Sequence, residues 1–372
     1  MARSIWRETS HLAGCALNWG AAWLKQRDIT MERKSPTIDQ NRRRFIGMAG
    51  GTLAAAQFGL VHSASGQSEP PGGATTETAA LFPGFSAESV KTSGTTIYVL
   101  RKGAGRPLLL LHGYPETHLT WHKVAPRLAE QFSVIVPDLR GYGDSGKPPG
   151  GERHENYSFR AMAQDQIDIM RGYGHDTFLV AAHDRGARAA HRLCLDHPES
   201  VDKVCLMDIA ATLTMYKGTN REFATKYMWW FFLIQSFPVP EHMIGLDPDF
   251  YLQDTFGALN KTPGAFAPEV MKEYVRAFSR PDAIHASCED FRASADIDLE
   301  MDEADEKAGR KIQCPIHALW GGRGTVGSLW DVLATWREKC AARVTGKALD
   351  CGHFLQEERP QDVLAELLQF FS

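Results

Sequence analysis

The chain has 372 residues, of which 43% are hydrophobic and 23% are charged, and its formal net charge is −4. This balance is that of an ordinary globular protein, and it excludes the strongly basic surface that nucleic-acid binding requires. The seven cysteines form no CxxC pair, and the sequence has neither an HExxH nor a GxxxxGK[ST] segment. We therefore expect no metal site, no cofactor and no nucleic-acid partner.

Residues 1–66 are predicted to be an export signal. The basic segment NRRRFIG (41–47) precedes a mildly apolar run at 48–61, and small residues suited to cleavage follow at 63–66. This order resembles a twin-arginine signal. A membrane anchor or a chance amphipathic helix is the alternative, but the run is shorter than the roughly 20 residues of a membrane span.

The export interpretation predicts a periplasmic protein without a stable membrane span in its mature form. The protein would be cytoplasmic if that interpretation is wrong. The arginines lie far from residue 1, so Met31 could be the true start. A segment rich in Ser, Gly, Pro and Thr follows the signal, and we interpret residues 67–81 as a flexible linker.

From residue 82 onward, short apolar runs alternate with helical patterns. The expected strands are 95–101, 107–111, 133–137, 177–182, 203–207, 315–320 and 346–349, and the expected helices are 125–131, 159–173, 187–195, 329–340 and 360–371. The alternation predicts an α/β fold, with a mostly parallel sheet flanked by helices. Residues 82–212 and 308–372 form this core, and ligands are expected at the carboxyl ends of its strands.

Residues 213–307 interrupt the alternation. No convincing strand occurs there, while aromatic residues and methionines recur at helical spacing, most densely in MWWFF (228–232). We expect an inserted helical cap over the strand ends. Most of its apolar residues would pack in its own core, and some would face the substrate and exclude water.

The segment AHDRG (182–186) joins an expected strand to an expected helix. Small residues around a central nucleophile are typical of the strand–turn–helix elbow of α/β-hydrolases, where serine usually stands. Here the central residue is Asp184. A carboxylate can displace a leaving group from saturated carbon and form an ester intermediate. A helix-capping role would explain the aspartate, but not its small neighbours.

An ester intermediate needs a base for its hydrolysis, and His353 follows the last expected strand. The strand at 315–320 is followed by GGRG (321–324), which lacks a carboxylate. We therefore assign Asp208 as the acid that orients His353, although it could instead cap a helix. The backbone N–H groups of Arg185 and Tyr114 are expected to form the oxyanion hole. Other histidines are expected to be structural or supporting, among them His112, His183 and His285.

Arg185 and Arg188 begin the expected helix, where cations oppose the helix dipole by about 0.3–1 kcal/mol. A structural ion-pair network is one explanation. We favour another, in which the two guanidinium groups bind a substrate carboxylate through paired hydrogen bonds. The adjacent carbon would then be held against Asp184 for in-line displacement.

These residues together resemble the haloacetate dehalogenases, including fluoroacetate dehalogenases, of the α/β-hydrolase superfamily over residues 82–372. The matching segments are HGYP (112–115), VPDLRGYGDSGKP (136–148), NYSFRAMAQDQ (156–166), HDRGAR (183–188), MDIAAT (207–212), DPDFY (247–251), CEDFRA (288–293) and GHF (352–354). The resemblance implies that a small haloacid loses its halide through an ester on Asp184, without cofactor or metal. It also implies a possible homodimer.

The sequence departs from this family at the halide pocket. The family pattern has a His-Trp pair on the first cap helix and a Tyr in a C-x-D-Y-R segment. Here Trp229 and Trp230 form the pair, and Phe291 stands in place of the Tyr. Two hydrogen-bonding groups for the leaving halide are changed. We therefore expect chloride or bromide to be released in preference to fluoride.

Two other functions fit the same motifs. An epoxide hydrolase shares the aspartate nucleophile, the histidine base and the ester, but it needs cap tyrosines to protonate the epoxide oxygen. Tyr216, Tyr227 and Tyr274 are available. A non-catalytic binder could keep the fold and the anion pocket, but the complete set of Asp184, His353 and Asp208 argues against it.

Overall fold

The computed structural model of the protein describes residues 80–372. The predicted export signal, and all but the last two residues of the predicted linker, lie outside the described residues. Within residues 80–372, no helix is both long enough and apolar enough to cross a membrane.

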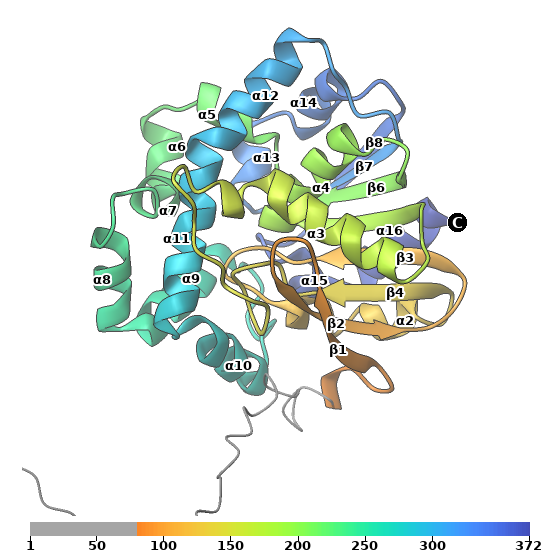
Figure 1. The fold of residues 1–372 in the computed structure, drawn as a ribbon, viewed down its shortest axis with the longest axis horizontal. Helices are drawn as coiled ribbons and strands as arrows, with labels where there is room; N and C mark the ends of the chain where they lie inside the picture. The colour runs from red at the N-terminus through yellow and green to blue at the C-terminus, as the bar shows by residue number, and fades with distance from the viewer. Residues whose placement is uncertain (1–79) are drawn as a thin grey trace, which may run out of the picture. The chain divides into compact units, whose positions relative to one another are not determined.

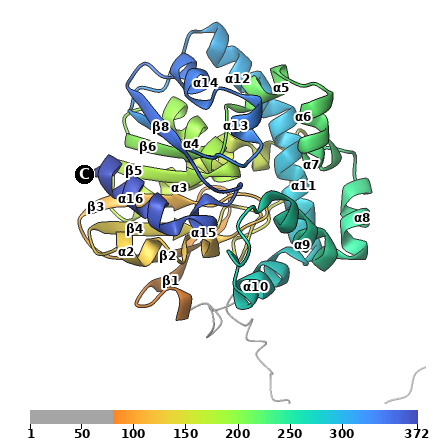
Figure 2. The same ribbon diagram turned by 180° about the vertical axis from the view of Figure 1, so that it is seen from behind.

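An eight-stranded sheet forms the core, in the order β1-β2-β4-β3-β5-β6-β7-β8 (Figures 1 and 2). The strands are β1 (Ser86–Lys91), β2 (Thr96–Lys102), β3 (Arg106–Leu111), β4 (Phe132–Pro137), β5 (Phe178–His183), β6 (Val201–Met207), β7 (Ile316–Gly321) and β8 (Val344–Leu349). The β1–β2 and β2–β4 pairs are antiparallel, and all other pairs are parallel. The predicted fold class is confirmed. Strand β1 was not predicted, because its sequence SAESVK is mostly polar and exposed.

Helices cover both faces of the sheet, as a largely parallel sheet requires. Helix α3 (Phe159–Gly172) lies in front in Figure 1, and α16 (Pro360–Phe371) lies in front in Figure 2. The remaining core helices are η1 (His118–Trp121), α2 (Ala125–Leu128), η2 (Glu155–Tyr157), α4 (Asp184–Asp196), α13 (Val326–Leu329), α14 (Val332–Lys339) and α15 (Leu355–Glu358). The helix expected at 329–340 is shorter, because Asp331 caps a new helix by accepting a hydrogen bond from the Ala334 N–H.

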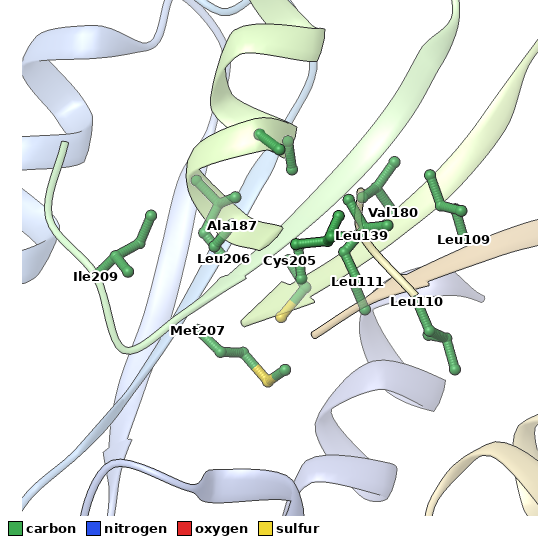
Figure 3. Packing of buried hydrophobic residues seen from close by; sticks show 14 of the residues in the cluster. Leu109, Leu110, Leu111, Leu139, Val180, Ala187, Cys205, Leu206, Met207 and Ile209 are labelled. Carbon is green, nitrogen blue, oxygen red and sulfur yellow. The ribbon is translucent and has the colours of Figure 1, made fainter. Parts of the chain in front are cut away.

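Apolar packing between sheet and helix fixes the start of α4. Every residue of β5 is buried, and leucines of β3 pack with apolar residues of β5, β6 and α4 (Figure 3). Labelled there are Leu109, Leu110, Leu111, Leu139, Val180, Ala187, Cys205, Leu206, Met207 and Ile209. Apolar side chains in such a core are close-packed and resist displacement. Their packing therefore fixes the position of the junction between β5 and α4.

The strand register brings three chain segments to one edge of the sheet. Ala182 is paired with Leu111, and His183 is paired with Met207. The residues that follow these strands therefore emerge side by side at the carboxyl ends of β3, β5 and β6, where ligands bind in such sheets.

A helical insertion separates β6 from β7. It comprises α5 (Thr212–Lys217), α6 (Arg221–Lys226), α7 (Met228–Phe232), α8 (Val239–Leu246), α9 (Pro248–Leu259), α10 (Pro268–Phe278), α11 (Pro281–Ala295) and α12 (Ile297–Lys307). Helices α7 to α11 lie to the left of the sheet in Figure 1. We call this insertion the cap. Large apolar side chains are exposed on it, namely Met228, Phe237, Val239, Met243, Leu246 and Phe250.

Candidate active site

Asp184 stands in a sharp turn between β5 and α4. Its φ of 43° lies in the left-handed region, which is strained for a residue with a side chain. A Cβ on Gly186 would lie 2.3 Å from the carbonyl oxygen of His112, and one on Gly113 would lie 2.5 Å from the Asp184 Cβ. Small residues are thus required around the turn. The N-cap residue of α4 is His183, so Asp184 is not the capping residue.

The structure brings Asp184, His353 and Asp208 together. Asp184 Oδ1 accepts a hydrogen bond from the backbone N–H of Tyr114 at 2.9 Å, and Oδ2 lies 3.9 Å from His353 Nε2. His353 Nδ1 lies 2.5 Å from Asp208 Oδ2, while Asp208 Oδ1 accepts the N–H of Gly321 at 2.9 Å. No carboxylate follows β7, but the N–H of Gly321 at the end of β7 binds the carboxylate of Asp208, which follows the neighbouring strand β6.

These contacts fix the orientation of the His353 ring. Asp208 accepts hydrogen bonds through both oxygens, so the Nδ1 of His353 carries the proton and Nε2 faces Asp184. The 3.9 Å between Nε2 and Asp184 is too long for a direct hydrogen bond. A cavity of about 20 Å³ is lined by Asp208, Tyr227 and His353, which is enough for one water molecule.

The surrounding charges keep Asp184 ionised. Burial alone would raise the pKa of this carboxyl, but a protonated His353, and then the charge of Arg188, hold it below its usual range. Conversely, burial lowers the pKa of Arg188 to about 10, although the Asp184 carboxylate opposes that shift. Asp184 is therefore a permanent anion at neutral pH, as a nucleophile must be.

Arg188 is buried without a carboxylate partner. Its Nη1 donates to the carbonyl of Ala210 at 3.0 Å and to the hydroxyl of Thr212 at 3.1 Å, and its Nε has no hydrogen-bond partner. The guanidinium carbon lies 4.6 Å from the centre of the Trp230 ring. No ion pair links Arg188 to a carboxylate within 4.0 Å in the described chain. A buried cation of this kind favours an incoming anion.

Arg185 has a different environment. Its Nε donates to Asp290 Oδ2 at 2.9 Å, its Nη2 bonds both Oδ1 and the backbone carbonyl of Asp290, and its guanidinium lies 4.1 Å from the Phe291 ring centre. The Tyr142 hydroxyl donates to the same carboxylate at 2.5 Å. Arg185 thus has the ion-pair partner that the structural alternative expected, whereas Arg188 has none. That both arginines bind a substrate carboxylate stays a prediction.

The residues expected at the halide pocket lie at different depths. Trp230 is buried beneath Arg188, and Phe291 packs edge-on against Tyr114 with ring centres 5.1 Å apart. Trp229 is only half-buried, and its ring contacts Tyr227 at 5.1 Å. The structure thus places Trp230 beside Arg188 and Phe291 beside Arg185. Trp229 instead packs against Tyr227.

The three cap tyrosines are separated in the structure. The Tyr274 hydroxyl donates to Glu357 at 3.2 Å, so it is engaged elsewhere. Tyr216 packs on Trp230 at 5.0 Å, with its hydroxyl buried and without a partner. Tyr227 lines the cavity beside His353, and its pKa is raised well above the usual range by burial and then by Asp208.

Several buried residues of the site were not predicted from the sequence. Asp290, the partner of Arg185, lies within the matched segment CEDFRA, so the motif itself was the available signal. Glu116 follows the HGYP turn and contacts His183 at 2.7 Å. Nothing in the sequence spacing of Glu116 and His183 indicates that their side chains are in contact.

Comparison with known proteins identifies the family. The model of the α/β hydrolase fold family matches residues 106–360. This chain is an α/β hydrolase. The hydrolase is 42% identical to the fluoroacetate dehalogenase of Burkholderia sp. over 293 residues. This alignment covers 78% of this chain and 95% of that protein. The resemblance to this group that the motifs predicted is thereby confirmed.

Two further relatives show the range of the family. The soluble epoxide hydrolase of Corynebacterium sp. (strain C12) is 32% identical to this hydrolase over 300 residues, 75% of this chain and 95% of that protein. The crystal structure of ALR0039 from Nostoc sp PCC 7120 is 51% identical with a TM-score of 0.77, and it covers 78% of this hydrolase and 99% of that chain. The site residues all lie within residues 106–360, the part of the chain that the family model matches.

Proposed function

We propose that this hydrolase removes the halide from a small haloacid through an ester intermediate on Asp184. The observation that carries the proposal is the buried guanidinium of Arg188, which lacks a carboxylate partner and lies beside a carboxylate nucleophile. The carboxylate of a substrate would supply the ion-pair partner that Arg188 lacks. The dehalogenase relative supports the same substrate class.

In the first step, Asp184 Oδ2 attacks the carbon that bears the halogen. The new C–O bond forms as the C–X bond breaks, and the halide leaves with the bonding electron pair. Arg188 holds the substrate carboxylate, which places the neighbouring carbon in line for attack. Asp184 Oδ1, which accepts the Tyr114 N–H, becomes the carbonyl oxygen of the ester.

In the second step, His353 Nε2 takes a proton from water as hydroxide adds to Cγ of Asp184. The Tyr114 N–H stabilises the oxyanion on Oδ1. The ester then collapses and releases a hydroxyacid, whose oxygen receives the proton from His353. Asp208, at 2.5 Å from Nδ1, stabilises the imidazolium in between.

We further propose that chloride or bromide is the preferred leaving group. Fluoride is strongly solvated, so its departure requires several hydrogen-bond donors. Phe291 donates none, and Trp229 is half-buried against Tyr227 rather than beside Arg188. Larger halides tolerate the apolar wall that remains.

Epoxide hydrolysis is a second candidate, and one observation favours it. Tyr227 is buried and lines the cavity that also contacts Asp208 and His353. A phenol in that place could protonate an epoxide oxygen as Asp184 attacks. The charged Arg188 argues against it, because a neutral epoxide offers no anion to this group.

An assay of the purified protein with chloroacetate and, separately, with a styrene-oxide-type epoxide distinguishes the candidate functions. Chloride release with no diol supports the dehalogenase. Diol formation without chloride release supports the epoxide hydrolase, and binding of chloroacetate without either product indicates a binder.

Two further properties stay proposals. Export to the periplasm can be tested by cell fractionation, with a variant in which both Arg42 and Arg43 are replaced by Lys as the control. The homodimer can be tested by light scattering, and the exposed apolar side chains of α8 and α9 provide a surface for it.

A further inference from the structure

A buried histidine–glutamate pair lies directly behind His353, and the two chemical steps do not use it. His183 ends β5, and Glu116 lies in the turn after β3. His183 Nδ1 is 2.7 Å from Glu116 Oε2, and its Nε2 is 2.8 Å from the backbone carbonyl oxygen of His353. Both side chains are buried.

The hydrogen bonds of Glu116 show that it is ionised. Its carboxylate accepts the N–H of Gly113 at 3.2 Å, the hydroxyl of Thr120 at 2.5 Å and the amide of Gln356 at 3.3 Å. A carboxyl group that only accepts has no use for a proton of its own. Burial opposes the charge, but His183 holds the pKa of Glu116 below its usual range.

The hydrogen bonds of His183 show that its ring is doubly protonated. One ring nitrogen faces a carboxylate and the other faces a carbonyl oxygen, and both of these groups can only accept. Both nitrogens must therefore donate, so the ring is an imidazolium. Although burial favours the neutral ring, Glu116 raises the pKa of His183 to about 9.

This fixed cation lies next to the proposed base. The ring centres of His183 and His353 are 4.6 Å apart. The carboxylates of Asp184 and Asp208 favour a proton on His353, and a like charge at this distance disfavours it. The Glu116 carboxylate also acts on His353, and it favours the proton. Tyr227 and Lys261 line the small cavity together with His353.

We propose that His183 and Glu116 form a positioning pair, in which the His183 cation opposes protonation of His353 between two carboxylates. His183 also holds the backbone carbonyl of His353, so the charge and the ring position are set by one residue. The inference rests on the proposed role of His353 as the base of ester hydrolysis, because a base must be free of its proton to act.

The first test is the pH dependence of ester decay in the Glu116→Gln variant. A neutral amide in place of the carboxylate removes the reason for a charged His183, so the acid limb of the decay rate should move to higher pH. The shift should be smaller than the full effect of that cation, because the opposing Glu116 carboxylate is lost with it. The alkylation rate should keep its pH profile. A uniform loss of rate at every pH, with the limb in place, would overturn the proposal and leave the pair a structural role only.

The matched control is Glu366→Gln. Glu366 pairs with His317 at 2.9 Å, and His317 lies near the start of β7, at the opposite end from Gly321 and Asp208. This variant removes the carboxylate partner of a histidine away from His353, together with the ion pair of that carboxylate with Lys347. Its acid limb should stay where it is in the wild type, and an equal shift in both variants would overturn the proposal.

The second test observes the ring directly by nitrogen-15 spectroscopy of histidine-labelled protein. Between the ordinary histidine pKa of about 6.5 and about 9, His183 should give the signal of a doubly protonated ring. Assignment uses a His183→Gln variant, and the signal should become that of a neutral ring in Glu116→Gln. A neutral His183 in the wild type would overturn the inference. This test needs no substrate, so it separates failure of the ion pair from failure of the proposed function.

Discussion

Replacing Arg188 with Met should abolish recognition of the haloacid while leaving the fold intact. Charge-assisted hydrogen bonds contribute about 1.5–3 kcal/mol each, so two bonds to a substrate carboxylate contribute about 3–6 kcal/mol. At about 1.4 kcal/mol per factor of ten, Arg188→Met should lower kcat/KM for chloroacetate by roughly 10²–10⁴-fold.

The stability of the same variant should change little. Arg188 has no carboxylate to leave behind, and the groups that lose a donor are the carbonyl of Ala210, the hydroxyl of Thr212 and the Sδ of Met215. That loss, at about 1 kcal/mol per bond, is offset by removal of a buried charge. The matched variant Arg185→Met leaves Asp290 buried without its cation and should cost about 3–5 kcal/mol.

The assay combines chloride release at varied substrate concentration with denaturant unfolding of both variants. The reasoning is refuted if Arg188→Met unfolds as readily as Arg185→Met, which would mean that Arg188 is structural. It is equally refuted if the wild type handles a neutral haloalkane as well as the haloacid, since no anion would then be needed.

Three further predictions follow from the site. In His353→Ala, alkylation should proceed and hydrolysis should stop, so the ester should accumulate in the intact mass; normal turnover would remove His353 from its role. Trp229→His combined with Phe291→Tyr should raise fluoride release relative to chloride release, and efficient defluorination by the wild type would contradict our account of the pocket. Folding raises the pKa of His183 from 6.5 to about 9, so its stabilisation is complete below the lower value and lost as pH rises through the higher. The free energy of unfolding should therefore fall by about 3 kcal/mol over that interval, and a fall of equal size in Glu116→Gln would exclude His183 as its source.

The order of elements along the chain was enough to predict that Asp184, His353 and Asp208 lie close together. Asp184, His353 and Asp208 each follow a strand, and the carboxyl ends of neighbouring parallel strands meet at one edge of the sheet. Their position after the strands thus carries spatial information. The fold class was predictable for the same reason, because buried strands and amphipathic helices alternate visibly.

Contacts between side chains that lie far apart in the sequence could not be predicted in this way. Arg185 and Asp290 are 105 residues apart, and His183 and Glu116 are 67 apart. No periodicity relates such positions, so the sequence could not distinguish an arginine with a partner from one without. The polar strand β1 was missed because edge strands need few apolar residues.

A single turnover in heavy-oxygen water tests the central claim, which is that Asp184 is the nucleophile. Enzyme in excess over chloroacetate should release a hydroxyacid whose new oxygen is unlabelled, because that oxygen comes from Asp184 Oδ2. The label should instead enter the Asp184 carboxylate, where mass spectrometry of the peptide that contains it would find one heavy oxygen. A labelled product after the first turnover, with an unlabelled peptide, would show direct attack by water and contradict the account.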